Sequence, residues 1–79
     1  MAIDVTPDVT IDLKGLSCPM PLLKMKKALK GMKSGQVLLG IGTDPGTAND
    51  IPGMCKKEGH ELLGIDEEGG IFKYYIKRS

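Results

Sequence analysis

The sequence predicts a two-layer α/β sandwich, in which two helices cover one face of a mixed four-stranded sheet. Short apolar or alternating runs, typical of strands, occur at four places in the chain. Two stretches with helical patterning separate the first three of these runs, which gives the order β-α-β-α-β-β. The 79 residues leave room for one core. We therefore treat residues 1–79 as a single domain, with residues 1–8 as a loose lead-in.

The first half of the chain predicts a strand, a helix and a second strand. Val9–Leu13 alternates apolar and polar residues, as a half-buried strand does. A helix is expected from about Pro19 to about Lys33, with Gly35 as its stop. Its apolar side chains recur at helical spacing: Leu22, Met25, Leu29 and Met32. Val37–Ile41 is a continuous apolar run and predicts a central strand.

The second helix has an uncertain start in the sequence. Asp44 can cap a helix that begins at Pro45, or Asp50 can cap a shorter one. We favour a start near Thr47 and an end near Gly59. The rest of the chain predicts a hairpin.

In this hairpin, Glu61–Ile65 and Ile71–Lys77 are the strands and Glu67–Gly70 is the turn. Alternation in the last strand places three side chains on one face: Phe72, Tyr74 and Ile76.

Composition and charge exclude several classes of protein. Lys and Arg total 11 and Asp and Glu total 10, so the net charge of +1 indicates neither a nucleic-acid nor a membrane partner. No apolar run is long enough to cross a bilayer, and no signal peptide is apparent. We expect a cytoplasmic monomer. Its two cysteines, Cys18 and Cys55, are expected to be free thiols.

Cys18 is the predicted reactive residue, because it opens the run Cys18-Pro19-Met20-Pro21 at the start of a helix. Proline suits a first turn, where a backbone N–H would have no partner. A thiolate beside the positive end of the helix dipole is stabilised, so the pKa of Cys18 should fall below about 8.5. The alternative is a small, inert, buried side chain.

The chemistry open to Cys18 is limited by what surrounds it in the sequence. The only histidine is His60, and no Cys/His nucleophile pair is evident. A redox dithiol would usually have a second cysteine where Pro21 stands. A lone thiolate suits thiol exchange, sulfur carriage and peroxide sensing, and all three remain open.

Two segments resemble the TusA/SirA/YedF family of sulfur carriers. The resemblance covers about residues 9–78 and includes the β-α-β-α-β-β order. Its motif residues are Gly15, Leu16, Cys18, Pro19 and Pro21, then Thr43-Asp44-Pro45, Asp50-Ile51-Pro52, Cys55 and Gly59-His60-Glu61-Leu62.

The resemblance implies a persulfide relay without a cofactor. Cys18 would accept sulfane sulfur from a cysteine desulfurase or rhodanese and pass it to an acceptor protein, with Gly15, Pro19 and Pro21 positioning it. The implied outlets are tRNA thiolation, cofactor biosynthesis and sulfur oxidation. The protein would be a carrier rather than a stand-alone enzyme. The alternatives are a non-catalytic interaction module and a redox sensor that pairs Cys18 with Cys55.

The remaining candidates each have a structural and a functional interpretation. Cys55 is a core thiol, or a resolving thiol for Cys18. His60 bonds locally to backbone, and we expect no metal site. Lys24, Lys26 and Lys27 form a solvated face, or a docking surface for an acidic partner protein.

Overall fold

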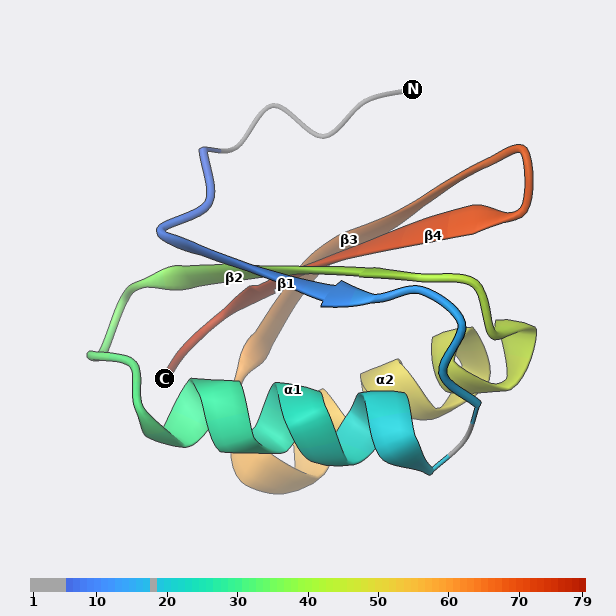
Figure 1. Cartoon of the computed structure of the whole chain (residues 1–79). Coiled ribbons are helices and arrows are strands. Elements are labelled where there is room, and N and C mark those ends of the chain that lie inside the picture. Colours follow the sequence, from blue (N-terminus) through green and yellow to red (C-terminus); the bar gives the residue numbers. More distant parts are fainter. Residues whose placement is uncertain (1–5, 18) are drawn as a thin grey trace.

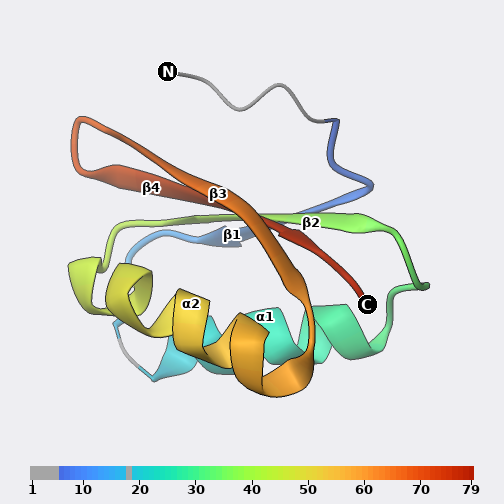
Figure 2. The same cartoon turned by 180° about the vertical axis from the view of Figure 1, so that it is seen from behind.

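The computed structural model describes residues 6–17 and 19–79 and confirms the predicted element order. The elements are β1 (Val9–Leu13), α1 (Met20–Lys30), β2 (Val37–Gly42), α2 (Pro45–Glu58), β3 (Glu61–Glu68) and β4 (Ile71–Lys77). Figures 1 and 2 show both helices on the same face of the sheet. The fold is therefore the predicted two-layer sandwich.

The sheet is mixed and has the strand order β1-β2-β4-β3. β1 and β2 are parallel, whereas β4 is antiparallel to both of its neighbours, β2 and β3. The predicted central position of the second strand is confirmed. β1 and β3 are left as the two edges. Because β1 and β2 are parallel neighbours, the loops that follow them, toward α1 and α2, leave from the same end of the sheet.

The core lies between the helices and the sheet. Its buried side chains come from both helices, from the segment just after α1 and from three of the strands: Leu13, Met25, Leu29, Met32, Leu38, Ile51, Met54, Cys55, Tyr74 and Ile76. Phe72, Tyr74 and Ile76 alternate along β4, and Tyr74 and Ile76 are completely buried, as the pattern predicted. The stacked rings of Phe72 and Tyr74 have centroids 6.2 Å apart.

The end of α1 differs from the prediction. The helix stops at Lys30 rather than near Lys33. Arg78 Nε donates a 2.6 Å hydrogen bond to the carbonyl oxygen of Leu29. In a longer helix the N–H of Lys33 would donate to that oxygen, but here it donates to Gln36 Oε1 instead. The Leu29 carbonyl oxygen also accepts from the N–H of Met32 at 3.1 Å, so the end of α1 is closed by a local turn together with a side chain 49 residues away in sequence, and Gly35 lies beyond it.

The start of α2 also differs from the favoured prediction. The helix begins at Pro45, not at Thr47, and Asp44 is its N-cap. The alternative with Asp44 as the cap is the correct one. The end is as expected, since Gly59 adopts a left-handed conformation with φ +78° and its N–H donates to the carbonyl oxygen of Cys55.

The hairpin turn is shorter than predicted. Glu67 and Glu68 pair with Phe72 and Ile71, so both belong to β3 and only Gly69–Gly70 forms the turn. These two glycines have φ of +59° and +83°. Two successive left-handed residues twist in the sense that a two-residue hairpin needs, and glycine adopts that conformation without strain.

Candidate functional site

The predicted reactive motif lies between β1 and α1. Cys18 itself is outside the described residues, and its neighbours Ser17 and Pro19 are both exposed. The site is therefore described by the elements on either side of that position.

The loop that leaves β1 is fixed by a contact with the loop that leaves β2. The backbone N–H of Gly15 donates to Thr43 Oγ1 over 3.1 Å, and the N–H of Leu16 turns back to the carbonyl oxygen of Leu13. Gly15 has φ +81°, a conformation that disfavours any residue with a Cβ. The motif glycine thus makes the turn toward position 18. Thr43 was named only among the motif residues of the resemblance, and this hydrogen bond was not predicted.

The first turn of α1 has no side-chain cap and no acidic side chain. Pro19 is the N-cap and makes no side-chain hydrogen bond, and Pro21 lies in the first turn, where proline was expected. The N–H of Met20 donates to the carbonyl oxygen of Ser17 over 3.0 Å. Within the described residues, nothing acidic lies in this turn. The positive end of the α1 dipole is therefore left without a neutralising side chain of its own.

The first turn of α2 is capped by Asp44. Its Oδ1 accepts from the N–H of Gly46 at 3.3 Å, and its Oδ2 accepts from the Thr47 hydroxyl at 3.1 Å. The Tyr74 hydroxyl donates to the Asp44 carbonyl oxygen at 3.5 Å, and burial, followed by the charge of Asp44, raises the pKa of Tyr74 to about 12. Figure 1 shows that α1 and α2 begin at the same end of the sheet.

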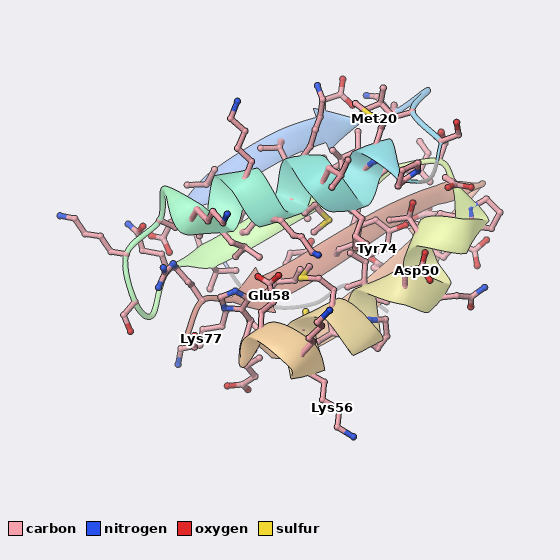
Figure 3. The ribbon with its side chains drawn as sticks, turned by 90° about the horizontal axis from the view of Figure 1, so that it is seen from below. Met20, Asp50, Lys56, Glu58, Tyr74 and Lys77 are labelled. Carbon is pink, nitrogen blue, oxygen red and sulfur yellow. The ribbon has the colours of Figure 1, made fainter. Side chains whose placement is uncertain are left out.

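A groove of about 530 Å³ lies between α1 and the outer edge of β1. It is lined by Ile11, Asp12, Met20, Leu23, Lys24, Lys27 and Ala28. Two of the three lysines predicted to dock a partner, Lys24 and Lys27, thus face this groove. Figure 3 shows Met20 at the N-terminal end of α1.

The third lysine, Lys26, faces the second helix instead. Its Nζ lies 3.6 Å from Glu58 Oε2 at the end of α2. Glu58 Oε1 in turn lies 3.7 Å from His60 Nε2, and His60 Nδ1 accepts from the N–H of Ser79 at 3.1 Å. His60 therefore bonds to backbone, as the structural interpretation expected, but its partner is Ser79, 19 residues away in sequence, rather than a local group.

Cys55 lies in the core on the inner face of α2. Its side chain is 2% exposed. Burial, followed by the nearby charge of Glu58, raises the pKa of the thiol to about 11, so the neutral form dominates at neutral pH. In residues 6–17 and 19–79, no three His, Cys, Asp or Glu side chains come together as a set that could bind a metal ion.

Comparison with known proteins identifies the family. The family model described as "Sulfurtransferase TusA" matches residues 9–78. This chain belongs to the TusA family. The match runs from the start of β1 to just beyond β4, so it includes both segments on which the resemblance rested.

Curated members of the TusA family are similar over nearly the whole chain. The sulfur carrier protein TusA of Allochromatium vinosum is 49% identical over 72 residues, which are 91% of this chain and 95% of that protein. The sulfur carrier protein TusA of Pseudomonas entomophila is 44% identical over 75 residues, covering 95% of this chain and 94% of that protein.

A solved structure has the same fold. The SirA-like protein of Desulfitobacterium hafniense superposes with a TM-score of 0.78 over 87% of this chain and 95% of its own, at 24% sequence identity. That similarity supports the architecture alone. As for membranes, no helix in the described part of this TusA-family chain has the length and apolar content to span a bilayer.

Proposed function

We propose that this protein is a sulfur carrier, which accepts sulfane sulfur as a persulfide on Cys18 and passes it to an acceptor protein. The observation that carries the proposal is the position of Cys18 directly before the proline-containing, acid-free first turn of α1, in a chain of the TusA family. Gly15, Pro19 and Pro21 are proposed to position the thiol.

The loading step needs only a thiolate and a donor persulfide. The Cys18 thiolate attacks the outer sulfur of the donor persulfide, a new S–S bond forms on Cys18, and the donor cysteine leaves as a thiolate. No net oxidation or reduction occurs, because one S–S bond forms as another breaks. The unneutralised N-terminus of α1 favours the attacking thiolate.

The structure offers little support for the redox-sensor alternative. A resolving cysteine attacks as a thiolate and must reach its partner. Cys55 is buried in the core and its pKa is raised to about 11. Both properties disfavour a disulfide between Cys55 and Cys18. The donor, of the cysteine desulfurase or rhodanese type, and the acceptor are proposed to be proteins, and the acceptor determines which sulfur pathway is served.

Intact mass measurement tests the proposal. The protein is incubated with a cysteine desulfurase and free cysteine, or with a rhodanese and thiosulfate. We expect a mass gain of one sulfur that is removed by a reducing agent. The gain should be absent from Cys18→Ser and retained by Cys55→Ser. A protein that gains no sulfur from either donor or from inorganic polysulfide is not a sulfur carrier.

A further inference from the structure

The groove between β1 and α1 combines features that point to a partner. Its lining includes Ile11 of β1 and Ala28 of α1, which are partly buried, and Met20 and Leu23 of α1, which are exposed. Met20 is 46% and Leu23 52% exposed, and they are two of the three exposed large hydrophobic side chains in the described part of the chain. A single exposed apolar side chain is ordinary, but two that line one groove form a patch able to hold an apolar side chain of a partner.

The backbone on one side of the groove is an open sheet edge. Among the described strands, β1 pairs with β2 alone. The outer side of β1 therefore presents N–H and C=O groups with no strand partner, which an extended chain can pair with. The groove thus offers backbone pairing along β1 and an apolar pocket beside it.

The charges around the groove select for an acidic occupant. Lys24 and Lys27 are exposed on α1 and line the groove. One carboxylate, Asp12, also lines it. Lys14 lies beside that carboxylate, with its Nζ 3.9 Å and its backbone N 3.0 Å from Asp12 Oδ1. The basic side of the groove is therefore not offset by Asp12, and carboxylates on the occupant would be favoured.

We propose that this groove receives an extended acidic segment of the protein sulfur donor, which adds to the edge of β1 as a further strand. An apolar side chain of the segment packs against Met20 and Leu23, and its carboxylates face Lys24 and Lys27. Only the assignment to the donor rests on the proposed function. In loading, the moving sulfur belongs to the partner, which must bring it to Cys18 on a segment of its own, and Met20, which lines the groove, follows Cys18 by two residues.

A peptide without cysteine tests the chemistry of the groove independently of sulfur transfer. The probe is a synthetic six-residue peptide that alternates glutamate with valine or leucine, titrated into the ¹⁵N-labelled full chain. We expect amide shift changes along Val9–Leu13 and Met20–Lys27, with a Kd below about 1 mM. The same peptide with lysine in place of glutamate, or with methylated backbone nitrogens, should bind at least about tenfold more weakly.

Variants of α1 supply the matched control. Leu23→Glu and Lys24→Glu should each weaken peptide binding about tenfold or more, whereas Lys30→Glu, exposed on the same helix but outside the groove, should bind as the wild type does. Shift changes confined to β3 and β4, equal binding of the lysine peptide, or no shift change at millimolar peptide would each overturn the proposal.

The donor assignment has its own readout. With a cysteine desulfurase and free cysteine, Leu23→Glu should need about tenfold more carrier for half-maximal loading, while inorganic polysulfide loads Cys18 of the variant and the wild type alike. Unchanged loading by the desulfurase would overturn the donor as occupant. Failure of polysulfide to load even the wild type would instead overturn the proposed function, and the peptide result would be unaffected.

Discussion

The two helices begin at the same end of the sheet, but their first turns are built differently. α2 starts with Asp44, whose carboxylate accepts from the N–H of Gly46 and the hydroxyl of Thr47. α1 starts with Pro19, which has no side-chain hydrogen bond, and its first turn contains no acidic residue. A carboxylate at the N-cap accepts hydrogen bonds from the first turn and neutralises the positive end of the helix dipole. The sequence of α2 therefore supplies its own cap. α1 has no carboxylate of its own at this end, and we propose that its positive end stabilises the Cys18 thiolate.

The same contrast applies to exposed apolar surface. Thr47 and Ile51 on the first turns of α2 are buried, whereas Met20 and Leu23 on the first turns of α1 are exposed. The apolar side of the start of α2 is therefore buried, whereas apolar side chains at the start of α1 are exposed to solvent. We infer that α2 serves the fold and that the beginning of α1 serves the partner and the thiol.

The largest expected effect concerns the difference in reactivity between the two thiols, Cys18 and Cys55. At pH 7 the native protein should react with iodoacetamide at Cys18 at least about a hundredfold faster than at Cys55. A thiol of pKa about 11 is thiolate in only about one molecule in 10,000 at pH 7. The rate at Cys55 should rise with pH toward 11. Mass spectrometry counts the adducts.

The control is the same reaction in denaturant, where both cysteines should be modified. Native Cys18→Ser should take up no label on the time scale of the wild-type reaction. Rapid labelling of Cys55 in native Cys18→Ser would contradict its place in a closed core and reopen the redox interpretation.

The elements of this fold were predictable because their signals are local. The alternation in β1 and β4, the apolar run of β2, and the proline and glycine positions around α1 and α2 act over a few residues. Those signals placed every strand and helix in the correct order. The Asp44 cap was also visible in the sequence, but it competed with Asp50, and local propensity did not separate them.

Other missed features depend on contacts between distant segments. Arg78 donates to the last turn of α1 from 49 residues away, and Thr43 accepts from the N–H of Gly15 from 28 residues away. Lys26, one of the three lysines predicted to dock a partner, pairs with Glu58 of α2 and does not line the groove. The groove exists only because β1 is an edge strand and α1 lies beside it. Both features depend on the order of the strands in the sheet, and that order cannot be predicted from the spacing of residues along the chain.

The next largest effect concerns the N-cap of α2. Asp44→Ala should lower the free energy of unfolding by about 2 kcal/mol, because it removes the N-cap acceptor and the carboxylate oxygen that accepts from the buried Thr47 hydroxyl. Asp44→Asn, which can still cap, should lose less. Urea unfolding at pH 7 measures both.

The matched change at α1 is Pro19→Ala, which should cost less than about 1 kcal/mol, acting mainly through the freedom of the unfolded chain. If the two substitutions destabilise the protein equally, the start of α1 is as much a structural cap as the start of α2, and the contrast between them fails.

The smallest effect comes from making the start of α1 resemble that of α2. Met20→Glu places a carboxylate in the acid-free first turn, where Met20 is 46% exposed. The charge should stabilise the helix by about 0.3–1 kcal/mol and disfavour a neighbouring thiolate by a comparable amount. The protein should therefore become slightly more stable while the pKa of Cys18 rises and its alkylation at pH 7 slows a few-fold.

Met20→Gln, which removes the methionine without adding charge, separates the electrostatic effect from the loss of the side chain. Both effects should shrink in high salt, because the first turn is exposed to solvent. If Met20→Glu and Met20→Gln alkylate at the same rate at low salt, the reactivity of Cys18 does not depend on the α1 dipole, and the motif must activate the thiol through its backbone geometry instead.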